Sequence, residues 1–209
     1  MLFRSGFTPQ AASLFCLSGP QLQGRLRRET VIDETRRSHR LQLDGLEVGS
    51  DAQLTGGDAL AALKWCHALG ALLHTAESAG GANSALLLTV DYLKTRKQFG
   101  QLIGSYQALK HPTVDAMIAV EHSRSHLYYA ASLFNGYDGG ESEVAVRMAK
   151  VHSNESFYFA SDRAIQFHGG MGFTHECNAG LHFRRAQWNK FSFGDTLHHR
   201  RHLRRLLMP

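Results

Sequence analysis

The sequence predicts a mostly α-helical fold, in which an up-down bundle of four helices follows a short β-structured segment. Two observations support this fold class. In about the first fifty residues, short apolar runs are broken by turn residues, whereas from Gly57 onward apolar side chains recur at helical spacing. Short loops separate the long helical segments, as is typical of antiparallel helices in a bundle. We therefore expect part of a β domain over residues 1–55 and a helical bundle over residues 56–209.

Length and composition limit the possible classes of protein. The 209 residues allow one domain, or one domain with a fragment of another, and a hydrophobic content of 43% is enough for a buried core. No apolar run approaches the roughly 18–20 residues needed to cross a bilayer, so no membrane span is expected. The three cysteines are odd in number and widely spaced, which fits a reducing compartment and predicts a cytoplasmic protein, with the mitochondrial matrix as the alternative.

The chain is basic, with a formal net charge of +5 and a pI of about 9.3. Much of the positive charge lies in residues 25–37 and 200–205. No nucleic-acid-binding motif accompanies it, so we do not predict a nucleic-acid partner. Two histidine pairs have i,i+4 spacing but lack the His-Glu-x-x-His pattern of zinc hydrolases, so no metal site is predicted: His122 with His126, and His198 with His202.

The N-terminal segment has two possible interpretations. Residues 1–24 contain no acidic residue and carry several serines, which resembles a transit peptide. Residues 12–17 are short and apolar and precede the turn residues Ser18–Pro20, which favours a β-strand, the interpretation that we prefer. Further on, residues 39–48 alternate in polarity on both sides of Asp44–Gly45, a dipeptide typical of hairpins, so we expect two strand pieces there.

Helical spacing begins near Gly57 and continues to about Phe99. Within this first helix, Gly80–Gly81 either kinks the chain or lets another helix approach closely. Ser105 is a plausible N-cap for the second helix, in whose first turns Pro112 should cause an irregularity. Three further helices are expected over residues 141–168, 178–189 and 195–207.

Two stretches carry the functional signal. Taken singly, Arg96–Gly100 reads as a basic helix end, and the glycines after Gln166 read as a helix C-cap. Taken together, they resemble a known family. Residues 92–111 look like the Y-x-x-x-R-x-Q-F-G-x-x-I-x-x-x-Q-x-x-K-H signature of acyl-CoA dehydrogenases, and residues 164–174 resemble their A-x-Q-x-x-G-G-x-G-[FY]-T signature. The resemblance covers nearly the whole chain from about residue 12.

This resemblance implies that the bundle is of the acyl-CoA dehydrogenase type and helps to bind FAD at a subunit interface. A guanidinium suits a pyrophosphate, and glycines let the main chain approach phosphate closely. By position, Arg96 would pair with the FAD pyrophosphate, Gln98 and Phe99 would contact the same region, and Ile103 and Gln107 the adenosine end. Gln166, Gly169 and Gly170 would hold the ADP part of a cofactor bound mainly by a neighbouring chain.

The same resemblance implies the reaction and the partners. The family dehydrogenates an acyl-CoA thioester between its α and β carbons, with a glutamate as the base that removes the α proton. The implied partners are the acyl-CoA substrate, a second copy or a different subunit bound through the bundle, and an electron acceptor such as an electron-transfer flavoprotein. The order Gly-Phe-Thr-His-Glu and then Phe-Gly-Asp looks most like the actinobacterial branch that handles steroid or other bulky acyl-CoAs.

The chain departs from the family pattern in two respects. It is about half the usual subunit, because the N-terminal helical domain and most of the β domain have no counterpart. The base glutamate is also missing: the Y-E-G-T segment of many members corresponds to residues 191–196, and the alternative base position on the first bundle helix is Gly70. Asp195 is the nearest carboxylate to the first position, and it serves either as a shorter base or as the N-cap of the last helix.

Three hypotheses follow. The chain is a subunit of an FAD-dependent acyl-CoA dehydrogenase, or it is a non-catalytic scaffold subunit that completes the FAD site of a full-length partner. The third is that it is a truncated fragment of a longer family member.

Overall fold

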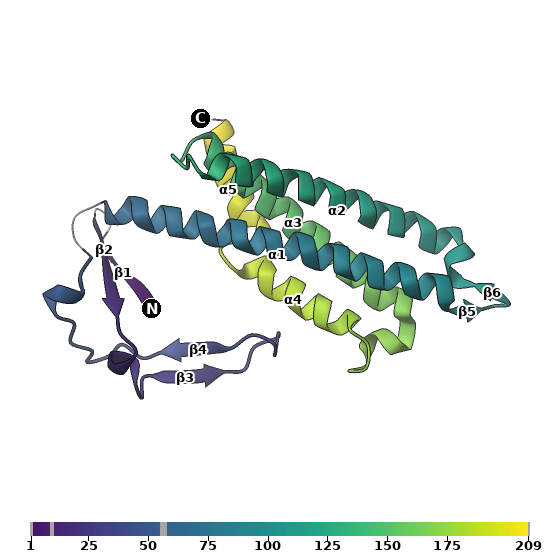
Figure 1. Ribbon diagram of the computed structural model, residues 1–209, viewed down its shortest axis with the longest axis horizontal. Coiled ribbons are helices and arrows are strands. Elements are labelled where there is room, and N and C mark those ends of the chain that lie inside the picture. Colours follow the sequence, from purple (N-terminus) through teal and green to yellow (C-terminus); the bar gives the residue numbers. More distant parts are fainter. Residues whose placement is uncertain (1, 9–10, 55–57, 209) are drawn as a thin grey trace. The chain divides into compact units, whose positions relative to one another are not determined.

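The computed structural model describes residues 2–8, 11–54 and 58–208, and it contains two compact units, Met1–His67 and Ala68–Pro209 (Figure 1). The boundary between the units lies within the first long helix, α1 (Ala59–Thr95). The first unit carries the N-terminal β-structure, and the second carries the helical bundle with a short hairpin between two of its helices. The predicted fold class, mostly α-helical with a short β segment at the start, is confirmed.

The first unit is built from two separate antiparallel hairpins. In the first hairpin Leu2 lies opposite Leu17, and in the second Leu26 lies opposite Leu41. The strand expected over residues 12–17 is confirmed, and Leu14 and Leu17 on it are buried. The elements are β1 (Leu2–Thr8), β2 (Ala11–Leu17), β3 (Leu26–Glu29) and β4 (Ser38–Leu41), with the short helices η1 (Pro20–Leu22) and η2 (Ser50–Ala52).

The prediction of a hairpin around Asp44–Gly45 is wrong. Strand β4 ends at Leu41 and pairs with β3, and no strand follows the turn at Asp44–Gly45 in the described part of this unit. The guanidinium of Arg25 explains why this turn needs no partner strand. Its Nη1 donates to the carbonyl oxygen of Asp44 at 3.0 Å and its Nη2 donates to that of Gly45 at 3.3 Å.

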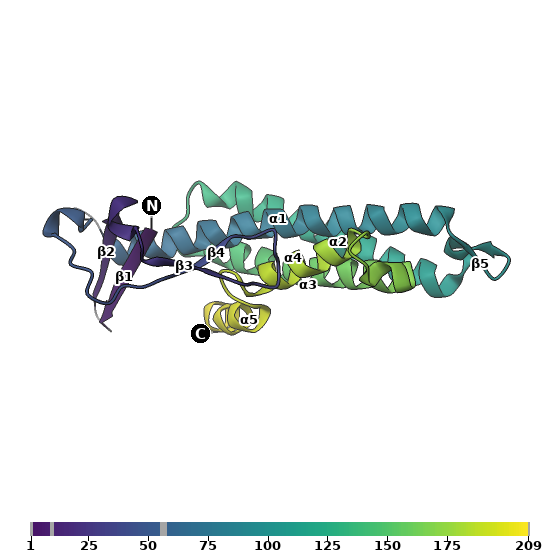
Figure 2. The same cartoon turned by 90° about the horizontal axis from the view of Figure 1, so that it is seen from below.

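The second unit is an up-down bundle with a short fifth helix (Figures 1 and 2). Helix α3 lies at its centre, because it packs against α2, α4 and α5. The bounds of α3 coincide with its predicted range. Each of the other helices begins within two residues of its own predicted start. They are α2 (Gln107–Phe134), α3 (Glu141–His168), α4 (Ala179–Phe191) and α5 (Thr196–Leu207).

Alanine dominates the bundle core, and this small side chain lets the helix backbones approach one another closely. Two clusters of buried apolar side chains fill the space between the helices. The first joins all four long helices through Ala82, Ala85, Leu86, Ala116, Val120, Phe157, Ala160, Ala164, Ala179 and Ala186. The second joins α1, α2 and α3 through Ala71, Leu72, Ala130, Ala145, Val146 and Ala149.

The glycine pair in α1 serves close packing. The helix continues through Gly80–Gly81. A Cβ added at Gly81 would lie 2.7 Å from Cε1 of the buried Phe157 on α3, whereas a Cβ at Gly80 would meet nothing within 4 Å. Gly81 therefore allows the close approach of another helix, because it leaves room for the ring of Phe157 on α3.

Ser105 does not cap α2 as predicted. The helix begins at Gln107 and its N-cap is Tyr106, which makes no side-chain cap bond. The Ser105 hydroxyl instead donates to the carbonyl oxygen of Leu102 at 2.6 Å, which closes the short helix η3 (Ile103–Ser105). The short helix η3 thus ends at Ser105, and α2 begins two residues later. Helix α2 then continues through Pro112.

Candidate functional site

The connection between α1 and α2 is a tight hairpin of β5 (Lys97–Gln98) and β6 (Gln101–Leu102). Its two turn residues, Phe99 and Gly100, have φ of 54° and 83°, as a two-residue hairpin turn with positive φ at both positions requires. The hairpin folds back on α1 because Gly104 has no side chain. A Cβ there would lie 2.7 Å from the carbonyl oxygen of Leu93.

This hairpin carries the first group of predicted cofactor residues. Arg96, Gln98, Phe99 and Gln107 are exposed, and the Phe99 side chain is 90% exposed although phenylalanine is apolar. The backbone of Arg96 is fixed on both sides, since its N–H donates to Tyr92 and its carbonyl accepts from Ile103, each at 2.9 Å. Across the described residues the Arg96 guanidinium forms no ion pair. Its charged side chain therefore extends from a backbone that hydrogen bonds hold in place. Ile103, in contrast, is buried.

The connection between α3 and α4 carries the second group. Gln166, Gly169 and Gly170 are exposed. Gly169 ends α3 with φ of 59°, and its N–H donates to the carbonyl oxygen of Gln166. Gly172 lies in the helix η4 (Gly169–Phe173) and is required by packing, because a Cβ there would lie 3.0 Å from Cα of Ile165.

Gly170 differs from these glycines, since the fold supplies no reason for it. Its φ is not positive, and a Cβ at this position would meet nothing within 4 Å. Phe173, three residues further on, is 82% exposed. A bare stretch of main chain beside an exposed aromatic ring fits a group that approaches from outside the chain.

The two connections lie at the same end of the bundle (Figures 1 and 2), where a stacked pair of rings joins α1 to α3. The Tyr92 ring near the end of α1 lies 4.2 Å from the His168 ring at the end of α3, with an angle of 24° between their planes. His168 is buried, and its Nδ1 donates to the carbonyl oxygen of Ala164 at 2.6 Å. This end thus combines a cation, side-chain amides, open main chain and exposed aromatic rings, which suits an anionic dinucleotide.

Asp195 lies far from this end, at the start of α5. It is the N-cap of that helix, and its Oδ1 accepts a hydrogen bond from the His198 N–H at 2.7 Å. The N-cap interpretation is therefore confirmed. Gly70 is also distant, because it lies on α1, 26 residues before Arg96, which follows the last residue of that helix. At the rise of an α-helix, 26 residues correspond to about 39 Å.

Both positions at which the resemblance would place the base are glycines, and aromatic side chains fill the space beside each. A Cβ at Gly70 would collide with the ring of Phe193 and lie 2.6 Å from its Cδ1. When Thr196 is aligned with the threonine of Y-E-G-T, Gly194 falls on the glutamate, and a Cβ there would lie 2.8 Å from Nε2 of His199. Sequence reasoning missed Phe193, since the pattern contains no signal that it reaches α1.

A buried polar cluster occupies the bundle interior near Phe193. Lys150 has no exposed surface, and its Nζ donates to Oδ1 of Asn154 at 2.9 Å and to the carbonyl oxygen of Asn189 at 2.7 Å. Burial lowers the pKa of Lys150 to about 8, although the charge of Glu77 acts in the opposite direction. The Asn189 side chain in turn bonds to His74, whose ring centre lies 5.2 Å from that of Phe193.

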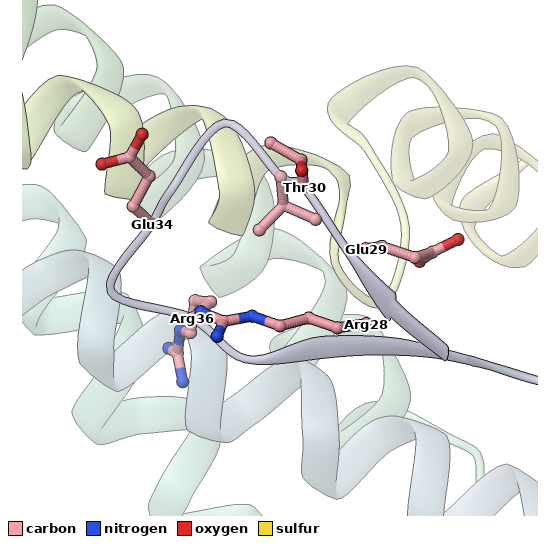
Figure 3. A pocket seen from close by; sticks show the side chains of 6 residues that line it. Arg28, Glu29, Thr30, Glu34 and Arg36 are labelled. Atoms are coloured by element: carbon pink, nitrogen blue, oxygen red, sulfur yellow. The ribbon is translucent and has the colours of Figure 1, made fainter. Parts of the chain in front are cut away.

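A separate hollow of about 450 Å³ lies within the first unit, at the loop between β3 and β4 (Figure 3). Its lining contains two arginines and two glutamates, so it offers no net charge that would select an ion: Arg28, Glu29, Thr30, Val31, Glu34 and Arg36. Within the residues that the structure describes, no group of three or more His, Cys, Asp or Glu side chains could hold a metal ion. Among the described residues there is also no helix that is long and apolar enough to cross a membrane.

Comparison with known proteins places these features in a family context. The family model described as "Acyl-CoA dehydrogenase, C-terminal domain" matches residues 58–208. A curated relative, the acyl-CoA dehydrogenase IpdE2 of Mycolicibacterium smegmatis, is 35% identical over 136 residues, which are 65% of this chain and 40% of the relative.

Solved structures show the same fold. The ChsE4-ChsE5 complex from Mycobacterium tuberculosis matches with a TM-score of 0.85 and 23% identity, over 98% of this chain and 54% of that chain. The Tcur3481-Tcur3483 steroid ACAD matches with a TM-score of 0.82 and 25% identity, over 98% of this chain and 54% of that chain. The chain therefore spans about half the length of the solved proteins that it matches.

Proposed function

The chain belongs to the acyl-CoA dehydrogenase family, and we propose that its bundle forms one wall of an FAD site in an assembly that oxidises acyl-CoA thioesters. When bound, FAD would supply the hydride acceptor for this reaction. The family match carries the general activity. The part played by this chain rests on the bundle end formed by the α1–α2 and α3–α4 connections.

Each residue at this end has a proposed role. The Arg96 guanidinium pairs with the FAD pyrophosphate, and it is suited to this because it forms no ion pair among the described residues. Gln98 and the exposed ring of Phe99 contact the same region, and Gln107 contacts the adenosine end. Gln166 and the main chain at Gly169 and Gly170 hold the ADP part. Ile103 is buried, so it contributes by anchoring the hairpin.

Distance supports a cofactor shared between chains. The FAD-binding end and the base position at Gly70 are separated by about 39 Å along α1. We infer from this separation that the two ends of a single bundle serve different cofactor molecules. A second bundle-bearing chain is then needed to complete each site. The observation that carries the proposal most directly is Gly170, whose missing side chain is explained by no contact with the residues that the structure describes.

The assembly is either a homo-oligomer or a hetero-oligomer formed through the bundle. Helix α2 supports this, since it exposes Val114, Met117 and Ile118. The proposed substrate is an acyl-CoA of the steroid or other bulky class, and the proposed electron acceptor is an electron-transfer flavoprotein. We also propose a cytoplasmic location, supported by three free cysteines.

Titration with FAD tests the cofactor role. Arg96→Gln should weaken FAD binding by the assembly about 10- to 100-fold, because a hydrogen bond to a charged group is worth about 1.5–3 kcal/mol. Arg124→Gln is the matched control. Arg124 lies on α2, about 25 Å along the helix from Gln107, and pairs with Glu121. Equal affinities of the parent and the Arg96→Gln assembly would refute the assignment.

A second candidate function is a non-catalytic scaffold, which the two glycines at the base positions favour. The variant Asp195→Asn separates it from a catalytic subunit, because asparagine is as good an N-cap as aspartate but is not a base. A large loss of acyl-CoA oxidation by the Asp195→Asn assembly would identify Asp195 as the base. An unchanged rate would exclude that role and support the scaffold.

A further inference from the structure

Phe193 occupies a strained backbone conformation. Its φ is 57°, in the left-handed region that bulky side chains rarely adopt, and the following Gly194 has φ of 102°. Such strain persists only where the surrounding structure holds it, and it clusters at functional sites. Phe193 is nevertheless only partly buried, so part of the residue remains at the surface of the bundle.

The ring is placed by a gap in α1. Gly70 leaves a depression on the helix surface, and the Phe193 ring lies so close to it that no Cβ fits between them. One turn further along α1, the His74 ring contacts Phe193 from the side, with 5.2 Å between ring centres. Gly70 and Phe193 are therefore complementary in shape, and a larger residue at either position changes the fit.

A relay from α3 holds the backbone of Phe193. The buried His199 lies with Nε2 3.1 Å from the Phe193 carbonyl oxygen and with Nδ1 3.3 Å from Nη1 of Arg147. A guanidinium can only donate, so Nδ1 accepts, and Nε2 carries the proton and donates to the carbonyl. Burial, and next the charge of Arg147, lowers the pKa of His199 to about 3, which keeps the ring neutral. Glu143 completes the relay by pairing with Arg147 at 2.7 Å.

We propose that Phe193, locked over Gly70 by His199, is a specificity-determining residue that closes the acyl site on the side of the α carbon. The inference rests on the proposed function, in which a side chain at position 70 would face the carbon that loses its proton. An aromatic ring there presents an apolar wall where other members place a carboxylate. It leaves little room for bulk at the α carbon and supplies no base.

Thermal unfolding of the full chain tests the lock without any ligand. Gly70→Ala should lower Tm by about 5 °C, because it overpacks the contact with Phe193. In the Phe193→Ala background the same substitution should raise Tm by about 2 °C, since alanine is favoured over glycine within a helix. An equal change of Tm in both backgrounds would overturn the lock.

The same readout tests His199 as a positioning residue. In a His199→Ala background, Phe193 is free to leave Gly70, so the loss of Tm caused by Gly70→Ala should shrink. In a His199→Gln background, where the amide can still donate to the Phe193 carbonyl, the loss should be retained. A loss of the same size in all backgrounds would show that His199 does not hold Phe193.

Ligand selectivity tests the specificity role in the flavin-containing assembly. Titrations would use butyryl-CoA and cyclohexanecarbonyl-CoA, which carries a ring directly at the α carbon. Phe193→Ala should shift the ratio of the two dissociation constants toward cyclohexanecarbonyl-CoA by about tenfold or more. A parent assembly that contains no flavin would refute the proposed function, whereas a flavin-containing parent that binds neither compound would refute the specificity role. A parent that binds them, with a ratio unchanged by Phe193→Ala, would refute only the specificity role.

Discussion

Lys150 provides a test of the bundle interior, because a fully buried ammonium is costly. Its Nζ has two hydrogen-bond acceptors, Asn154 and Asn189, but neither is a carboxylate. Burial lowers the pKa of Lys150 from 10.5 to about 8 in the folded chain. The unfolded chain then binds a proton between these values that the folded chain does not bind. Stability should therefore rise as the pH rises from about 8 toward 10.5.

The size of the effect follows from the two pKa values. A tenfold difference in proton affinity is worth about 1.4 kcal/mol, so the gap between about 8 and 10.5 amounts to about 3 kcal/mol in full. Between pH 7 and pH 10 most of this difference, about 2–3 kcal/mol, should appear. Lys150→Met removes the titrating group. Between pH 7 and pH 10 the free energy of unfolding of the parent should therefore rise by that amount relative to the free energy of unfolding of the variant.

Urea unfolding at pH 7, 8, 9 and 10 measures this difference between the parent and Lys150→Met. The control is Lys110→Met, which replaces an exposed lysine on α2, and its difference from the parent should stay constant over the same interval. Parallel profiles for the parent and Lys150→Met would refute the reasoning, since they would show that Lys150 has no depressed pKa in the folded chain.

Two further substitution pairs test the packing and the cap. Gly81→Ala should lower the free energy of unfolding by about 1–3 kcal/mol, because its methyl group meets Phe157, whereas Gly80→Ala should raise it by about 0.5–1 kcal/mol. Urea unfolding compares them, and a loss at position 80 as large as at position 81 would contradict the packing. Asp195→Ala should cost about 1 kcal/mol through the lost bond to the His198 N–H, and Asp195→Asn should cost little, as thermal unfolding would show. Equal losses in the two Asp195 variants would argue against the cap.

Local patterns predicted the helices well because helical contacts repeat every three or four residues. Helix α3 has the predicted bounds, Glu141–His168, for this reason. The hairpin at Asp44–Gly45 failed because the pairing of β4 depends on a strand that lies well upstream. A turn dipeptide carries no information about a partner so distant in sequence, and none about Arg25, which binds the carbonyls of that turn.

For the candidate site, too, local patterns were predictable from the sequence, whereas contacts between distant residues were not. The two signature stretches identified the loops, but their placement at one end depends on the Tyr92–His168 stack, which joins separate helices. The two roles considered for Gly80–Gly81 were separated only by the position of Phe157 on α3. The contact of Phe193 with Gly70 joins the start of α1 to the segment before α5, and no spacing rule connects these residues. Contacts of this kind follow from packing in three dimensions.

The central claim is that this bundle end holds FAD together with a second chain. Native mass spectrometry of the purified assembly measures its subunit composition and its bound flavin at once. We predict a mass larger than that of one chain with FAD bound, and an Arg96→Gln assembly of the same subunit composition that has lost flavin. An assembly without flavin, or one that retains the same amount after Arg96→Gln, would contradict the claim.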